Sequence, residues 1–456
     1  MLNSIEMLEI MMGTVKAGGI IVPLSVMLTA ESLATMINDS DSRCIFAGAP
    51  FARVVDSIRR DLPNISSEGF FVVGDETHNW IAWIDYQRWR DESTDAPPQV
   101  RLTPDDDFNL IYSSGTTGTP KGIAHTHYAR QQSAYILAIE FRFDQNSIAV
   151  VTTPPFANGT WIMMLPSLLG RRLVVMPQFD PTTFLDLVAR ERCTHTFMVP
   201  TQYIVTMDVP GFDSFDLSSL KVLLSAGAPL RADTKEQMLQ KFRDGVFELY
   251  GLTEGIATTL KPEEMEGKLC SVGTTVFGGD IRIIDDAGSE VPTGEAGEIV
   301  GYNSALMRGY YKKLEGTSAA VWKDEAGRTY LRTGDVGKLD EDGFLYILDR
   351  KKDMIVSGGV NVFPKDIEEI VARHPEVTDV AIIGLPHDKW GETPLALVIK
   401  RPASTLSTEE LTQWANERLA KHQRITGVEF RDQFPRNALG KVLKKELREP
   451  YWHNEG

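Results

Sequence analysis

The sequence of 456 residues has few cysteines and no long apolar run. Its three cysteines, Cys44, Cys193 and Cys270, are widely spaced and odd in number. They show neither a disulfide framework nor metal-ligand spacing, which favours a reducing compartment, the cytoplasm. No apolar run reaches the roughly 18 residues that a membrane span needs. The first segment is broken by Glu6 and Glu9 and lacks a basic start, so we expect neither a signal peptide nor an integral membrane contact.

Positive charge is also scarce, because 47 Lys and Arg stand against 63 Asp and Glu for a net charge of −16. This balance argues against nucleic acid or an anionic membrane surface as the main partner, while a local basic pocket can still hold an anion. Repeats of fixed period and low-complexity tracts are lacking too. A chain of this length, with 42% apolar and 24% charged residues, predicts a soluble globular protein of two or three domains.

Short β-rich runs alternate with helical runs from residue 1 to about 348. Helical patterns at 181–192 and 231–242 lie between runs that end in Gly, Pro or Ser. The alternation predicts an α/β fold with mainly parallel sheets and helices packed on them. The predicted strands are RCIFAG, FFVVG, FNLIYSS, SIAVVTTPP, RRLVVMP, HTFMVP and KVLLSAG.

The pattern changes after Gly273. IRIIDD, GEIV, TYLRTGD and GFLYILDR predict a small antiparallel, barrel-like unit, and the charged run DRKKD (349–353) predicts a hinge. Beyond it, a helix at 363–374, strands at 379–385 and 395–400, and a capping box of Ser407 with Glu410 predict a small α+β domain. We therefore expect a large N-terminal domain at 1–349 and a small mobile domain at 350–456.

The run YSSGTTGTPKG (112–122) directly follows an apolar strand. Its glycines allow backbone N–H groups to face a ligand closely, and its hydroxyls and lysine add donors and charge, which together suit a polyphosphate. A simple surface turn is the alternative, and the Walker pattern is not met because Gly122 follows Lys121. The candidate ligands are Ser113, Ser114, Gly115, Thr116, Thr117, Gly118 and Lys121.

Together with YGLTE (250–254), RTGD (332–335), DRKKDMIVSGGVNVFP (349–364) and PRNALGK (435–441), this run resembles the acyl-adenylate-forming family, in its acyl-CoA synthetase branch. The resemblance extends from about residue 6 to residue 448. It implies that a carboxylate attacks the α-phosphate of ATP to give acyl-AMP and pyrophosphate. A thiol, usually that of coenzyme A, then displaces AMP.

The resemblance also implies roles for single residues. The loop would hold the β- and γ-phosphates, Tyr250 would stack on adenine, Thr253 would touch phosphate, and Glu254 would bind Mg²⁺. Gly251 would belong to the same nucleotide site. One carboxylate suffices for Mg²⁺, which keeps several waters. Alone, Glu254 would be a solvated loop acid.

Further family positions lie along the chain. Asp335 would accept the ribose hydroxyls with Arg350 beside it, although an isolated GD pair is usually a turn. The small residues Ala226, Gly227 and Ala228 would let adenine and the carboxylate approach the backbone, as would any strand-end turn.

The last group of positions lies in the C-terminal part. Lys441 would bridge the carboxylate and the α-phosphate during adenylation, and otherwise belongs to a solvated basic patch. Lys352 would be the hinge residue. Gly358 and Gly359 would line the path of the thiol, and an ordinary β-turn explains them equally well.

The sequence departs from the family pattern in two places, and both affect how far the family's residue roles apply to this chain. Relatives usually carry some dozens of residues before the segment that begins near residue 9, so we expect a short N-terminus. Relatives also usually have Phe-His where this chain has Phe156 and Ala157, which makes the acyl pocket larger or more apolar. Trp161 is either core or a gate of the acyl tunnel. The predicted pocket residues are Phe156, Trp161, Tyr203 and Ser225, with Met163, Met164 and Phe277 as further apolar candidates.

No arginine or histidine is obviously placed to pair with a second carboxylate, which disfavours a dicarboxylic acid. The first prediction is a medium- or long-chain fatty acid, and the second an aromatic acid of the cinnamate or benzoate type. The expected cofactors are ATP, Mg²⁺ and coenzyme A, and a homodimer is left open. The alternatives are an enzyme that loads a carrier protein, a luciferase-type oxidase, and a non-catalytic nucleotide- or acyl-binding protein.

Overall fold

The computed structural model describes residues 1–74, 82–113, 121–154, 156, 158–242, 245–436 and 442–452. The chain divides into two compact units. Unit 1 comprises Met1–Asp280 and Tyr302–Leu331, and unit 2 comprises Ile281–Gly301 and Arg332–Gly456. The predicted boundary at 349/350 stays a prediction.

The largest sheet of unit 1 has seven strands in the order β12-β11-β10-β9-β8-β6-β7. The strands from β7 to β10 are parallel, and β11 and β12 add antiparallel pairs at one edge. Strands such as VLLS are buried at every position, as expected for parallel strands covered on both faces. The bounds are β6 (Ile148–Val151), β7 (Arg172–Val175), β8 (His195–Met198), β9 (Val222–Ser225), β10 (Val246–Gly251), β11 (Ala257–Leu260) and β12 (Thr274–Thr275).

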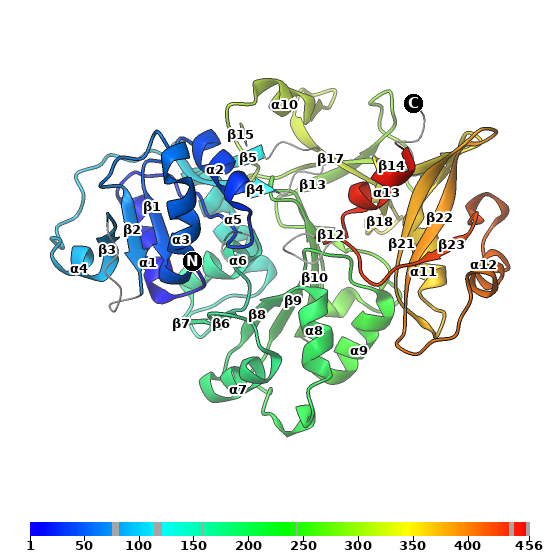
Figure 1. The fold of residues 1–456 in the computed structure, drawn as a ribbon, viewed down its shortest axis with the longest axis horizontal. Coiled ribbons are helices and arrows are strands. Elements are labelled where there is room, and N and C mark those ends of the chain that lie inside the picture. Colours follow the sequence, from blue (N-terminus) through cyan, green and yellow to red (C-terminus); the bar gives the residue numbers. More distant parts are fainter. Residues whose placement is uncertain are drawn as a thin grey trace. The chain divides into compact units, whose positions relative to one another are not determined.

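Helices α7 (Pro181–Glu191), α8 (Pro200–Met207) and α9 (Ala232–Phe242) follow one another along this sheet (Figure 1). The side chain of Asp180 caps α7 by accepting from the Thr183 N–H at 2.7 Å, and Pro181 occupies the first turn. Phe184, Leu185 and Val188 are buried, and burial of each such side chain contributes roughly 1.5–3 kcal/mol. Elsewhere in unit 1 lie α5 (His127–Glu140), α6 (Asn158–Met164) and α10 (Leu314–Ala319).

A second sheet joins β4 (Asp107–Ser113), β5 (Lys121–Thr126) and β15 (Gly309–Tyr310) in the order β15-β5-β4. All its pairs are antiparallel. FNLIYSS is therefore not part of a parallel sheet, because the short connection from β4 to β5 can join only antiparallel neighbours and a parallel pair needs a longer crossover.

The N-terminal part of unit 1 forms a three-stranded parallel sheet, β1-β2-β3, with helices beside it. Its core contains Ala52, Leu62, Phe70 and Val72. The bounds are α1 (Ile5–Lys16), α2 (Ala30–Asp39), β1 (Ile45–Gly48), α3 (Ala49–Ile58), β2 (Phe70–Val73), β3 (Ile84–Asp85) and α4 (Tyr86–Asp91).

A sheet with the order β13-β14-β17-β16 includes the strands predicted after Gly273. In this sheet β17 pairs antiparallel with both β16 and β18. Strand β17 is long and continues from unit 1 into unit 2. The bounds are β13 (Asp280–Ile284), β14 (Gly297–Tyr302), β16 (Val321–Lys323), β17 (Thr329–Leu339) and β18 (Leu345–Arg350).

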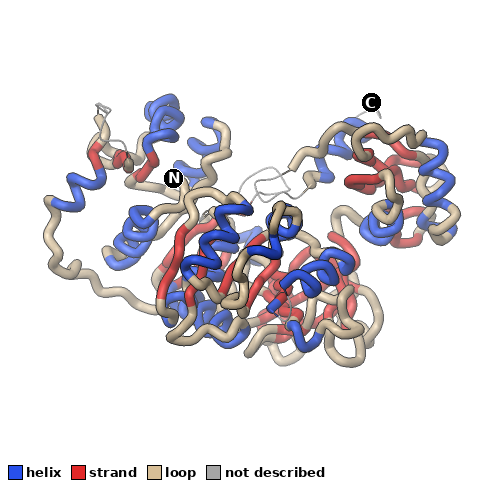
Figure 2. Tube along the Cα trace, turned by 90° about the horizontal axis from the view of Figure 1, so that it is seen from below, coloured by secondary structure: helices blue, strands red, loops and turns tan. Residues whose placement is uncertain are grey.

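The C-terminal part of unit 2 has a five-stranded sheet with helices beside its strands (Figure 2). The capping box opens a helix as predicted, because Ser407 Oγ accepts from the Glu410 N–H at 3.2 Å and Glu410 accepts in return from the Ser407 N–H at 2.9 Å. The bounds are β19 (Ile355–Ser357), β20 (Val360–Val362), α11 (Pro364–Val371), β21 (Val377–His387), β22 (Gly391–Lys400), α12 (Thr408–Asn416), β23 (Val428–Phe430) and α13 (Lys444–Trp452).

The predicted α/β fold class, with its large parallel sheet and smaller α+β part, is confirmed. Within the described ranges, no helix is both long and apolar enough to cross a bilayer.

Candidate active site

Three segments of unit 1 bring Lys121, Glu254 and Tyr310 together. Strand β5 begins at Lys121, and its pairing with β15 sets Tyr310 opposite Ile123. The hydroxyl of Tyr310 donates to Oε1 of Glu254 at 2.9 Å, and the ammonium of Lys121 lies 4.8 Å from the centroid of its ring. Tyr310 thus contacts two predicted site residues. Sequence reasoning missed it, because a tyrosine in RGYYK has no fixed spacing to YGLTE.

The charges at this position suit a polyanion. Burial, and then the charge of Glu254, raises the pKa of Tyr310 far above its ordinary value, so the hydroxyl stays protonated and donates. Lys121 forms no ion pair with a carboxylate of the described residues. Its charge is therefore available to pair with an anion.

The turn after β10 is held firmly in place. The N–H of Gly255 donates to Leu252 at 3.0 Å, and the N–H of Met307 donates to the carbonyl of Glu254 at 2.8 Å. Gly255 has a φ of +115°, and a Cβ there would lie 2.6 Å from the carbonyl oxygen of Ala305. Only glycine fits such a position, so the turn fixes the backbone that carries Thr253 and Glu254.

Strand β9 ends at Ser225, and the predicted small residues follow it. Ala226 is buried, Gly227 has a φ of +87°, and Ala228 is half-buried. The hydroxyl of Ser225 is completely buried and has no hydrogen-bond partner in the described part of the chain. A buried polar atom without a partner is uncommon, and it fits a ligand group that approaches this turn.

The predicted pocket residues do not all line one cavity. Trp161 is 1% exposed and packs edge-on against Phe108, with ring centroids 5.7 Å apart. Tyr203 is fully buried, and its hydroxyl donates to the carbonyl of Leu224 at 3.0 Å. Both side chains belong to the core, whereas Phe156 is half-buried and Phe277 is 64% exposed.

A surface groove, here called the α5 groove, has a volume of about 730 Å³ and lies along one side of helix α5. It contains Phe277 but none of Phe156, Trp161 and Tyr203. Most of its surface is apolar, and its lining includes Tyr135, Ile139, Leu169, Phe277, Gln132 and Ser304.

Sequence reasoning also missed Arg130, on α5. Its guanidinium carbon lies 5.2 Å from the ring centroid of Trp161, and the side chain is 4% exposed. A single arginine in a helical pattern gives no sign of such burial.

In unit 2, the pairing of β17 with β18 sets Asp335 opposite Arg350. Nε of Arg350 lies 3.2 Å from Oδ1 of Asp335, and the aspartate is buried. The backbone N–H of Asp335 donates to the hydroxyl of Thr333 at 3.0 Å, and that hydroxyl donates to the carbonyl of Ile299 at 2.8 Å. These contacts hold the strand that presents the carboxylate.

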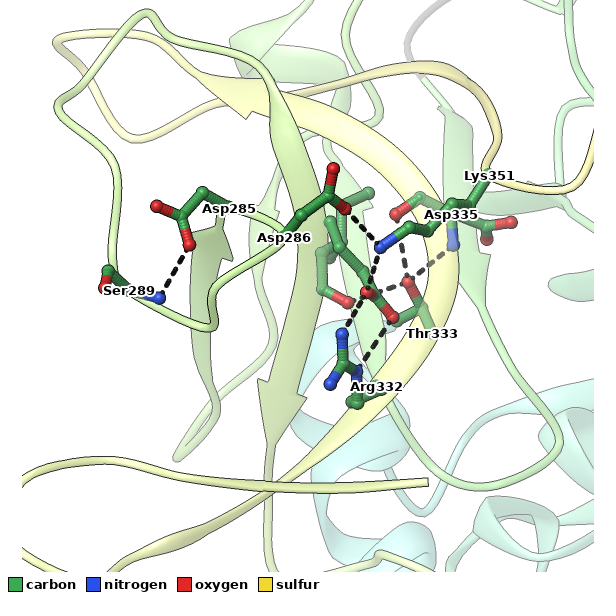
Figure 3. A network of polar contacts seen from close by, with 9 residues as sticks. Asp285, Asp286, Ser289, Arg332, Thr333, Asp335 and Lys351 are labelled. Atoms are coloured by element: carbon green, nitrogen blue, oxygen red, sulfur yellow. Dashed lines mark hydrogen bonds and ion pairs between the residues drawn. The ribbon is translucent and has the colours of Figure 1, made fainter. Parts of the chain in front are cut away.

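A charged network supports the same strand (Figure 3). Nη2 of Arg332 lies 2.6 Å from Glu298, and the ammonium of Lys351 lies 3.1 Å from Glu298 and 2.8 Å from Asp286. These cations hold the pKa of Glu298 below its ordinary value, in spite of its burial.

The hinge candidate and the glycine pair lie in a short stretch of unit 2. Lys352 is exposed, and its carbonyl accepts from Nη1 of Arg448 at 3.3 Å. Gly358 and Gly359 form the two-residue turn between β19 and β20, with φ of +59° and +79°. Two positive φ values in succession are the requirement of a type I′ hairpin, so the turn geometry alone explains both glycines.

Several predictions lie outside the described residues. They are those for Ser114, Gly115, Thr116, Thr117, Gly118 and Lys441, together with the side chain of Ser113. Tyr250 is half-buried at the end of β10, and Gly251 is exposed.

Comparison with known families shows which family the chain belongs to. The profile of the AMP-binding enzymes matches residues 1–311, and the profile of the AMP-binding enzyme C-terminal domain matches residues 366–441. The chain belongs to the AMP-binding enzyme family. The predicted resemblance to the acyl-adenylate-forming enzymes is thereby confirmed.

Individual AMP-binding enzymes resemble the chain over most of its length. The long-chain-fatty-acid–CoA ligase FadD13 of Mycobacterium tuberculosis (strain ATCC 25618 / H37Rv) is 32% identical over 98% of this chain and 86% of its own. The feruloyl-CoA synthase of Amycolatopsis sp is 36% identical over 78% of this chain and 72% of its own. The crystal structure of ATP-bound MatB from Rhodopseudomonas palustris has a TM-score of 0.86 at 28% identity, and covers 99% of this chain and 87% of that chain.

The relatives are CoA ligases, and the chain, as a member of the acyl-CoA synthetase branch of the family, is an acid–thiol ligase that forms AMP. It uses ATP, Mg²⁺ and coenzyme A. Its residues fit this set. The carboxylate of Glu254, which accepts from the hydroxyl of Tyr310, is the kind of oxygen donor that would hold Mg²⁺. In proteins this ion is held by one or two carboxylates together with phosphate and water oxygens.

Proposed function

We propose that this AMP-binding enzyme joins a medium- or long-chain fatty acid to coenzyme A through an acyl-AMP intermediate. The α5 groove carries the proposal. Its volume of about 730 Å³ lies within the range of small-molecule sites, and its lining is mainly apolar. It is also open to the surface, which accommodates chains of different lengths better than a closed pocket would.

The groove adjoins the loop that holds the YGLTE turn. Ser304 lines the groove, and its neighbour Asn303 donates through Nδ2 to the carbonyl of Gly255 at 2.5 Å. The same loop supplies the Met307 N–H that binds the Glu254 carbonyl. An acyl chain in the groove would therefore lie next to the segment that carries the proposed reacting centre.

We assign the chemistry of adenylation to charged and hydroxyl groups. Lys121 and the run 113–118 hold the triphosphate, and Thr253 contacts phosphate. Mg²⁺, held by Glu254, would neutralise phosphate charge when bound. Lys441 stabilises the charge that moves from the acid carboxylate to the α-phosphate, a role in which loss of one donor typically costs about 10²–10³ in rate.

Other residues hold the nucleotide and the thiol. Tyr250 and the residues Ala226–Ala228 adjoin adenine, and Asp335 accepts the ribose hydroxyls while Arg350 orients its carboxylate. In the second half-reaction, Gly358 and Gly359 line the path of the thiol after a movement about Lys352.

Pyrophosphate release tests the proposal. The enzyme is given ATP and Mg²⁺ with decanoate, palmitate, cinnamate or benzoate, and pyrophosphate and orthophosphate are measured separately. We expect pyrophosphate only when an acid is present, with decanoate or palmitate turned over fastest, and coenzyme A consumed in step. Orthophosphate without acid, or no release with any acid, would contradict the proposal.

An aromatic acid is the second candidate, favoured by the 36% identity to a feruloyl-CoA synthase. A higher kcat/KM for cinnamate than for both fatty acids would select it. Pyrophosphate release without consumption of coenzyme A would instead indicate a carrier-protein thiol as the acceptor.

A further inference from the structure

Arg130 is a buried cation, and its hydrogen bonds to the described residues all involve neutral groups. Its Nε donates to Oδ1 of Asn109 on β4 at 2.7 Å, and its Nη1 donates to Oδ1 of Asn158 at 3.1 Å. Asn158 is the first residue of α6, the helix that carries Trp161. The arginine therefore joins β4, which leads into the run 112–122, to α6, which carries the predicted pocket residue Trp161.

The third contact of Arg130 leads to the YGLTE motif. Its Nη2 lies 3.3 Å from Nδ1 of His125. A guanidinium only donates, so Nδ1 must accept and the proton of the imidazole is on Nε2. His125 also forms a hydrogen bond with the backbone of Thr253. Burial and then the charge of Arg130 lower the pKa of His125 well below its ordinary value, so the ring is neutral.

No carboxylate of the described residues neutralises Arg130. Burial lowers its pKa to about 9, which still leaves the guanidinium charged at pH 7. Two further buried donors in this cluster, Nδ2 of Asn109 and Nε1 of Trp161, have no acceptor among the described residues. The cluster is thus rich in donors and poor in acceptors, and an unneutralised buried charge is costly unless something compensates for it.

We propose that Arg130 is a positioning residue for the acid substrate. Its charge favours the anionic carboxylate at the reacting centre, and its planar fork ties the first residue of α6 to His125, which bonds the backbone of Thr253. This inference rests on the proposed function, because it assigns the reacting carboxylate to the neighbourhood of Thr253. Arg130 lies outside the sequence motifs that are typical of the family.

The substitution Asn109→Asp tests the charge of Arg130 separately from the packing around its side chain. Aspartate has nearly the shape of asparagine and keeps the oxygen that Arg130 Nε contacts, while it replaces a donor that has no partner. The new carboxylate pairs with a buried cation, so the unfolding midpoint is expected to stay the same or rise. The same pairing removes the positive field, so the KM of the acid is expected to rise about tenfold, equivalent to about 1.4 kcal/mol.

The measurement uses the full chain, ATP, Mg²⁺ and whichever of decanoate, palmitate, cinnamate and benzoate the wild type activates best. Arg130→Met should raise the KM of the acid at least as much as Asn109→Asp, whereas Arg130→Lys keeps the charge and should retain most of the affinity. Arg190→Met, at an exposed arginine on α7 (side chain 66% exposed), is the matched control and should leave KM unchanged.

An Asn109→Asp protein with an unchanged unfolding midpoint and an unchanged KM would overturn the proposal. A loss confined to acids with a second carboxylate, tested with azelate, would overturn the assignment to the reacting carboxylate. If Asn109→Asp does not fold, equal KM values for Arg130→Lys and Arg130→Met overturn it instead. A wild type that releases no pyrophosphate with any acid overturns the proposed function, whereas an active wild type with unaffected variants overturns only the role of Arg130.

Discussion

At the scale of single residues, the site depends on side chains whose surroundings, rather than their type, determine what they do. The sequence motifs identify Glu254 and Lys121 but not Tyr310, which contacts both. Arg130 was likewise unremarkable in the sequence. Such residues acquire their role only when strands and helices far apart in the chain pack together, and a single sequence gives no sign of that packing.

Removal of the Tyr310 hydroxyl should weaken the site without unfolding it. Tyr310→Phe keeps the ring beside Lys121 but loses the hydrogen bond to the Glu254 carboxylate, and a bond to a charged group contributes about 1.5–3 kcal/mol. We expect the rate of adenylate formation to fall about tenfold, equivalent to about 1.4 kcal/mol. The Mg²⁺ concentration for half-maximal rate should change as well.

Tyr311→Phe is the control for this change, because the neighbouring hydroxyl donates to Asp41 at 2.8 Å and contacts no proposed site residue. Steady-state pyrophosphate release at a series of Mg²⁺ concentrations measures both effects. Equal rates for the two variants would show that the contact with Glu254 has no function.

Two buried histidines should make the protein sensitive to mild acid. Burial lowers the pKa of His195 to about 4, and the pKa of His125 is also lowered. An unfolded histidine has a pKa of about 6.5, so below that pH the unfolded chain binds more protons than the folded chain. The free energy of unfolding should therefore fall as pH drops from 6.5 towards 4, by about 1.4 kcal/mol per pH unit for each histidine.

Urea unfolding at pH 7.5, 6.0 and 5.0 checks this dependence. His195→Gln removes one titrating group and should reduce the slope by about half if both histidines contribute as described. A free energy of unfolding that is constant between pH 6.5 and 5.0 would refute this account.

At the scale of elements, runs of β-branched and apolar residues predicted the strands of the large parallel sheet well. SIAVVTTPP, HTFMVP and KVLLSAG all contain strands that are buried on both faces, and this burial produces continuous apolar runs. FNLIYSS has the same composition but lies in an antiparallel sheet, because pairing depends on the length of the connection that follows and not on the strand itself.

The turn after β10 should tolerate no side chain at Gly255. Gly255→Ala combines a positive φ, which costs about 1–3 kcal/mol for other residues, with a Cβ 2.6 Å from the Ala305 oxygen. We expect displacement of the segment that carries Glu254 and at least a tenfold loss of pyrophosphate release. Gly267→Ala also has a positive φ, of +73°, but its Cβ meets open space.

The Gly267→Ala control should lose only about 1 kcal/mol of stability and keep its activity. Activity and unfolding midpoint are measured for both variants. The account of the turn fails if Gly255→Ala is as active as Gly267→Ala.

At the scale of the whole molecule, the proposed roles are divided between two units. Lys121, Glu254 and Tyr310 belong to unit 1, while Asp335 and Lys441 belong to unit 2. The family and fold could be predicted because five motifs occur in the family's order. The acid could not be predicted, because pocket shape depends on packing: Trp161 and Tyr203 are core residues, and the exposed Phe277 lines the α5 groove.

The proposed reaction has two halves, adenylation and thioester formation. We predict that a substitution can impair one and spare the other. In the proposed function, Lys441 acts only on the charge that develops during adenylation, so Lys441→Ala should lower that rate by about 10²–10³. Transfer of a preformed acyl group from AMP to coenzyme A needs no such cation and should continue.

The most direct measurement compares the wild type and Lys441→Ala in both half-reactions. The first assay is acid-dependent exchange of pyrophosphate into ATP, and the second is thioester formation from added decanoyl-AMP and coenzyme A. We expect exchange to be nearly abolished in the variant, while thioester formation stays within about threefold of the wild type, a difference under 1 kcal/mol. Equal loss in both assays, or exchange by the wild type that does not depend on an acid, would contradict the account.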